Sequence, residues 1–119
     1  VSASMLKPGD AAVGISNTGI SKHVVDALRI SGEKGATTIG ITGNRETDLA
    51  GASEICLVTP LASQDAPLYG GSIDAKVCQL YLVDLLYLGV LFRLGSPAKR
   101  NLQETARVLR TYYNPVFSV

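Results

Sequence analysis

Hydroxyl side chains gather in one short segment of this chain, residues 16–21, which reads Ser-Asn-Thr-Gly-Ile-Ser. The hydroxyls of Ser16, Thr18 and Ser21 can each donate a hydrogen bond to an anionic oxygen. Gly19 has no side chain, so the backbone there can approach a ligand closely. The spacing matches neither a Walker A loop, which needs Gly-Lys-Ser/Thr, nor a GxGxxG dinucleotide turn. These residues are typical of an uncharged site for a phosphate group.

The hydroxyl-rich segment lies between a predicted strand, residues 11–16, and a predicted helix, residues 21–34. In an open α/β sheet the carboxyl ends of the strands line the ligand crevice, and a helix start offers unpaired N–H groups to an anion. We therefore expect the hydroxyls of Ser16 and Ser21 to face a solvent-filled crevice. Serine is also an ordinary N-cap residue, so simple capping of the helix is the alternative.

Two more strands are predicted at residues 37–42 and 54–59, with a helical turn at residues 47–52 between them. Continuous apolar strands separated by helices indicate a parallel sheet with both faces covered, so the fold class is α/β. Thr42 and Asn44 lie at the carboxyl end of the second strand, where side chains would contact the hydroxyl groups of a ligand. Turn formation explains Asn44 equally well.

The rest of the chain is predicted to be a loop at residues 61–71, a long helix at residues 72–94 and a last helix at residues 96–113. Ser96 is the expected N-cap of the last helix, ahead of proline at its first position. The long helix is apolar around most of its circumference, which predicts a homodimer or higher homo-oligomer. We expect no membrane span, because polar residues interrupt it. They are Asp74, Lys76, Gln79 and Asp84.

Length and composition predict one domain, residues 1–119. Hydrophobic residues make up 46% of the 119, which excludes disorder, and the net charge of +1 lacks the basic excess of a DNA-binding domain. Cys56 and Cys78 form no disulfide or zinc motif and are expected as thiols in a reducing cytoplasm. No secretory signal is seen, and the first residue, Val1, indicates a fragment of a longer protein. No metal or cofactor is expected.

Residues for acid–base catalysis are sparse. His23 is the single histidine, and we interpret it as an exposed first-turn residue without an orienting partner. Lys22 either adds positive charge beside the phosphate or is simply solvated. Other charged side chains are interpreted as solvated or structurally paired, and no catalytic residue is assigned. The acidic ones are Glu46, Asp48, Glu54, Asp74 and Asp84, and the basic ones of the last helix are Lys99, Arg100, Arg107 and Arg110.

The order of these segments resembles a sugar isomerase (SIS) domain, and especially the effector domain of RpiR-family transcriptional regulators. The segments that carry the resemblance are residues 6–10 (Leu-Lys-Pro-Gly-Asp), 16–21, 35–42 (Gly-Ala-Thr-Thr-Ile-Gly-Ile-Thr), 52–57 (Ala-Ser-Glu-Ile-Cys-Leu) and 80–87 (Leu-Tyr-Leu-Val-Asp-Leu-Leu-Tyr). Together they span most of the chain up to residue 94.

The resemblance implies a three-layer, flavodoxin-like sandwich whose first two family strands are absent from this chain, so that strand 11–16 lies at a sheet edge. It also implies a non-enzymatic domain that binds a phosphorylated sugar, with DNA contacted only through a helix-turn-helix domain absent here. The implied ligand-binding residues are Ser16, Asn17, Thr18, Gly19, Ser21 and Thr42. The alternatives are an aldose–ketose isomerase of the same fold and a structural domain whose loop is merely capped.

Overall fold

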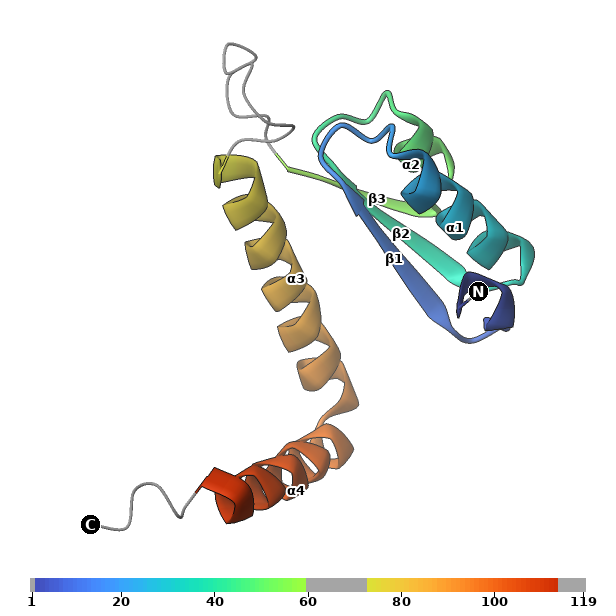
Figure 1. The fold of residues 1–119 in the computed structure, drawn as a ribbon. Coiled ribbons are helices and arrows are strands. Elements are labelled where there is room, and N and C mark those ends of the chain that lie inside the picture. The colour runs from blue at the N-terminus through green and yellow to red at the C-terminus, as the bar shows by residue number, and fades with distance from the viewer. Residues whose placement is uncertain (1, 60–72, 114–119) are drawn as a thin grey trace. The chain divides into compact units, whose positions relative to one another are not determined.

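The computed structural model describes residues 2–59 and 73–113. The chain divides into two compact units, Val1–Tyr81 and Leu82–Val119, so that the division falls inside the helix Ile73–Leu94 and not between the two described ranges. Their order along the chain is shown in Figure 1. Every predicted boundary of the described helices and strands lies within one residue of the observed one, while the predicted loop at residues 61–71 falls outside the described residues. The elements in chain order are a 3-10 turn Ser2–Met5, β1 Ala11–Ser16, α1 Lys22–Glu33, β2 Thr37–Thr42, α2 Asp48–Gly51, β3 Ile55–Val58, α3 Ile73–Leu94 and α4 Ser96–Tyr113.

The strands form a parallel sheet in the order β1-β2-β3, which confirms the predicted α/β class (Figure 1). Because the two pairings are in register, Ser16 at the end of β1 lies opposite Thr42 at the end of β2. Within the described residues β1 is an edge strand, as expected. Both βα loops therefore begin at the same edge of the sheet, where a ligand could touch both.

One face of the sheet is covered by α1 and α2. The core of this unit lies between these two helices and the sheet. Val25, Leu28 and Leu49 are 5%, 2% and 0% exposed. Gly14 of β1 lets the helices approach, because a Cβ there would lie 3.2 Å from side-chain atoms of Leu49 and Val24. Burying side chains of this size contributes about 1.5–3 kcal/mol each, which anchors both helices firmly to the strands that carry the loops.

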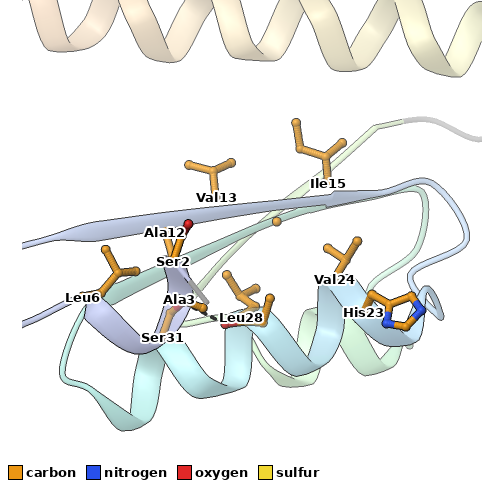
Figure 2. Close-up of a pocket in the computed structure, with 12 residues that line it drawn as sticks. Ser2, Ala3, Leu6, Ala12, Val13, Ile15, His23, Val24, Leu28 and Ser31 are labelled. Carbon is orange, nitrogen blue, oxygen red and sulfur yellow. Dashed lines mark hydrogen bonds between the residues drawn. The ribbon is translucent and has the colours of Figure 1, made fainter.

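The opposite face of the sheet is apolar and partly exposed. Val13, Ile15 and Ile55 are 50%, 40% and 45% exposed. Figure 2 shows Val13 and Ile15 directed away from α1. The predicted three-layer arrangement needs a second covering layer on this face, because an apolar surface of this kind is costly to leave in water.

The second half of the chain consists of α3 and α4, joined at Gly95, whose φ of 61° turns the chain. α4 begins at Ser96, the residue predicted as its N-cap: the N–H of Lys99 donates to the carbonyl of Gly95, so Ser96 is already helical. By length and composition alone, residues 75–94 of α3 are apolar enough to cross a membrane, and of these residues Ala75 is buried whereas most others are exposed. The polar residues along α3 therefore do not by themselves exclude a membrane span.

Candidate functional site

The segment Ser16 to Ser21, which we call the hydroxyl loop, is closed by its own hydroxyl groups. Ser16 Oγ lies 2.9 Å from Ser21 Oγ and accepts a hydrogen bond from the N–H of Gly19 at 3.1 Å. Ser16 is 7% exposed, whereas Ser21 and Thr18 are exposed. The expectation that Ser16 faces a crevice was therefore wrong. The Ser16 hydroxyl is buried and stabilises the turn of the loop through its hydrogen bond with Gly19.

The start of α1 has no side-chain cap. Ser21 occupies the N-cap position, but its hydroxyl makes no capping hydrogen bond and lies against Ser16 instead. The carbonyl of Ser21 accepts from Val24 and Val25, and within residues 2–59 and 73–113 the N–H groups of Lys22 and His23 have no partner. Simple capping thus does not explain Ser21. An uncapped helix start with free N–H groups is a favourable place for an anion.

Thr47, in contrast, caps the start of α2 with its side chain. Its side chain accepts from the N–H of Ala50 at 3.3 Å at the start of α2. The helix there has only four residues, against twelve in α1. The longer helix, with the stronger terminal dipole, is thus the one left without a side-chain cap.

The hydroxyl loop is fastened to the connection between β2 and α2. The N–H of Gly43 donates to the carbonyl of Asn17, and the N–H of Leu49 donates to the carbonyl of Gly19, both at 2.9 Å. Gly19 has a φ of 68° and lies directly against the side chain of Thr47. Sequence analysis did not assign Gly43 or Thr47 to the site, since their contact with the loop depends on how the strands pair.

Two buried polar atoms at this end of the sheet have no hydrogen-bond partner in the described part of the chain, Oδ1 of Asn17 and Oγ1 of Thr42. Thr42 is 0% exposed, and its carbonyl accepts from both the N–H and the hydroxyl of Thr59. Buried oxygen atoms without partners are rare because each forfeits a hydrogen bond to water. The structure thus brings Thr42 beside Ser16, as expected, but buries it instead of exposing it.

Other polar residues near the loop have structural roles. Asn44 Oδ1 accepts from the N–H of Glu46 at 2.9 Å, which is the turn that the sequence offered as an alternative. Lys22 Nζ lies 4.0 Å from Asp26, which also pairs with Arg29 at 3.6 Å. Such exposed pairs contribute about 0–1 kcal/mol, so Lys22 keeps its freedom to move towards an anion at the start of α1.

One cavity that the described residues line includes none of the hydroxyl-loop residues (Figure 2). It has a volume of about 610 Å³ and runs between β1, α1 and the 3-10 turn, with His23 at one end. Its walls are mostly apolar, and it includes neither Ser21 nor Thr42. A site for a phosphorylated sugar needs polar groups, so this groove is better understood as the uncovered flank of the edge strand.

Among the carboxylates considered for catalysis, the exposed Asp48 lines a pocket with Ile20 and Lys22, beside the hydroxyl loop. His23 and Glu54 are exposed, and no hydrogen bond joins either side chain to another in the described residues. In α4, Arg107 pairs with Glu104 at 3.1 Å on an exposed face, which is the solvated pairing the sequence indicated. No group of three His, Cys, Asp or Glu side chains in the described part of the chain could hold a metal.

Comparisons with known proteins agree on the kind of domain. The sequence model of the SIS domain matches residues 2–89, which includes most of α3. An uncharacterized HTH-type transcriptional regulator of Caldanaerobacter subterraneus is 36% identical over 91% of this chain, and the HTH-type transcriptional regulator RpiR of Escherichia coli K12 is 26% identical over 97%. The chain spans 38% of the length of each.

Among solved structures, the Vibrio vulnificus NanR protein complexed with ManNAc-6P superimposes with a TM-score of 0.76 at 30% identity. The superposition covers 91% of this chain and 40% of NanR. The relatives are not all regulators. The N-acetylmuramic acid 6-phosphate etherase of Symbiobacterium thermophilum is 28% identical over 79% of this chain and 31% of its own length.

Proposed function

Because this chain belongs to the SIS domain family, we propose that it binds a phosphorylated sugar and is the sensing part of a transcriptional regulator. The regulators that it resembles, and NanR with its bound ManNAc-6P, support this proposal. Residues 1–119 then act as one partial SIS domain in the cytoplasm, without a metal or cofactor. In such a regulator a separate helix-turn-helix domain would bind the DNA.

The observation that carries the proposal is the uncapped start of α1. The N–H groups of Lys22 and His23 are free, and the exposed hydroxyls of Thr18 and Ser21 stand beside them. A phosphate there would accept hydrogen bonds from both kinds of donor and lie at the positive end of the helix dipole. Ser16, Asn17 and Gly19 would shape the loop, and the buried Thr42 would support it from the end of the neighbouring strand.

Sensing requires that the sugar bind two arrangements of the regulator with different affinity, because a ligand shifts an equilibrium only by its differential affinity. We propose that these arrangements belong to a homodimer. The apolar side chains along α3 support this, since Leu80 and Phe92 are 70% and 84% exposed. A second copy of the chain would cover such residues and couple two sugar sites.

The second candidate is an enzyme acting on a sugar phosphate, which the etherase relative favours. An enzyme of this kind needs a general base within hydrogen-bond reach of the substrate and held by a partner. His23 lacks a partner among the described residues, and the exposed Asp48 sits at the start of α2. We therefore propose that the domain binds its sugar without converting it.

The test is calorimetric titration of ManNAc-6P and of inorganic phosphate into the wild-type chain and into the double variant Thr18→Ala, Ser21→Ala, which removes the two exposed hydroxyls. A lost hydrogen bond to a charged group costs about 1.5–3 kcal/mol, or roughly ten- to a hundredfold in affinity. Ser96→Ala at the start of α4 is the matched control and should bind like wild type. Equal affinity in wild type and double variant would overturn the site.

A further inference from the structure

The contact between Gly19 and Thr47 joins the hydroxyl loop to a part of the chain far away in sequence. We propose that Thr47 is a positioning residue of the site: its side chain, pressed against Gly19, holds the hydroxyl loop in the shape that presents the start of α1. The effect on ligand affinity rests on the proposed function. The effect on the loop itself does not, and it is measured separately.

Gly19 has no room for any side chain. A Cβ at this position would overlap the Cβ and Oγ1 atoms of Thr47 and lie 2.6 Å from its Cγ2. The side chain of Thr47 therefore occupies the space that a side chain at Gly19 would fill. Gly19 also has a φ of 68°, and its N–H donates at 3.1 Å to both the carbonyl and the hydroxyl of Ser16. The turn of the loop and the position of Thr47 are thus set together.

Thr47 is itself held in place from both sides. Its Oγ1 donates to the carbonyl of Asn44 at 3.2 Å and accepts from the N–H of Ala50 at 3.3 Å. These bonds fix the side chain with respect to the connection before it and the helix after it. A β-branched residue also has few allowed rotamers. The Thr47 side chain therefore has little freedom to move away from Gly19.

Two backbone hydrogen bonds flank this contact. Gly43 donates to the carbonyl of Asn17 on one side, and Leu49 donates to the carbonyl of Gly19 on the other. Leu49 is fully buried in the core, so its backbone is anchored to the sheet. The loop after β1 therefore takes its shape from the connection after β2, and Thr47 is the side chain at the centre of that contact.

The experiment separates the shape of Thr47 from its hydroxyl. Thr47→Val keeps the branched shape against Gly19 and loses both Oγ1 hydrogen bonds. Thr47→Ala loses the same two hydrogen bonds and also removes the Oγ1 and Cγ2 atoms that lie against Gly19. The measurements are hydrogen exchange of the Gly19 amide relative to the amides of β2, the melting temperature, and the affinity for ManNAc-6P.

If Thr47 acts by shape, Thr47→Val lowers the melting temperature but leaves Gly19 exchange and affinity within about twofold of wild type. Thr47→Ala then lowers the melting temperature about as much as Thr47→Val but speeds Gly19 exchange at least fivefold, with a matching loss of affinity. Ser53→Ala is the control: it removes the 2.6 Å bond from Ser53 Oγ to the carbonyl of Leu49 and destabilises α2 without touching Gly19. Its relative Gly19 exchange should be unchanged.

The proposal is overturned if Gly19 exchange and ligand affinity change in parallel with the melting temperature in all three variants. Thr47 would then be only a helix cap. If wild type binds no ManNAc-6P, the proposed ligand is wrong, and the exchange of Gly19 alone decides whether Thr47 shapes the loop. The two failures are thereby distinguishable.

Discussion

Replacing Gly19 by alanine should destabilise the fold and distort the site. The loss in the free energy of unfolding has two parts. The first is backbone strain: at a φ of 68° an L-residue with a Cβ costs about 1–2 kcal/mol. The second is overlap with Thr47, which must leave its position as the cap of α2. Losing a threonine N-cap costs about 1 kcal/mol. Gly19→Ala should therefore lower the free energy of unfolding by roughly 2–3 kcal/mol.

Gly9 offers a matched control within the same unit. Its φ is 96°, but a Cβ there would meet no atom within 4 Å. Gly9→Ala should consequently show only the strain, about 1–2 kcal/mol. The difference between the two variants isolates the overlap with Thr47.

Urea unfolding of the two variants, with the slope of the free energy against urea unchanged, measures both costs. A double variant Gly19→Ala, Thr47→Gly removes the overlapping side chain, and glycine is itself a tolerable N-cap. In that background the cost of Gly19→Ala should fall to that of Gly9→Ala, giving a coupling energy of about 1 kcal/mol. Equal costs for Gly19→Ala and Gly9→Ala in the wild-type background would refute the reasoning, because the contact would then be too soft to matter.

Three further predictions concern activity and assembly. No deuterium should enter the carbon beside the carbonyl of fructose 6-phosphate incubated with the protein in heavy water, because neither His23 nor Asp48 has an orienting partner among the described residues; protein-dependent exchange seen by NMR would favour the enzyme. Light scattering should find a homodimer at micromolar concentration, and Phe92→Lys, which places a charge on the exposed face of α3, should shift it towards monomer; a wild-type monomer would contradict this. Val13→Lys should reduce self-association through the edge strand β1, because a lysine on an edge strand opposes pairing with another chain; unchanged association would show that β1 is not the surface involved.

The identity and order of the elements could be predicted from the sequence, because their signals are local. Apolar runs such as residues 37–42 and helical spacing such as that of Val25 and Leu28 each lie within one segment. The hydroxyl loop could also be located, since its hydroxyls and Gly19 are neighbours in sequence. The edge position of β1 followed from the family resemblance and agrees with the observed strand order.

The exposure and partners of the loop residues could not be predicted in this way. Nothing in the local sequence says that Ser16 is buried, that Ser21 bonds to it instead of capping α1, or that Thr42 loses all contact with solvent. These properties depend on which atoms the curled loop brings within 3 Å, and several chain paths satisfy the same local pattern.

The amino-acid sequence by itself determined the α/β class, the parallel strands and the place of the hydroxyl loop, because periodicity and turn residues act over a few positions. Only the tertiary structure decided that Thr47 and Gly43 belong beside that loop. Their contact arises because β1 and β2 pair in parallel and in register, which brings the loops after both strands to one edge of the sheet. Pairing between distant segments depends on the whole sheet, so the role of Thr47 became visible only in the folded chain.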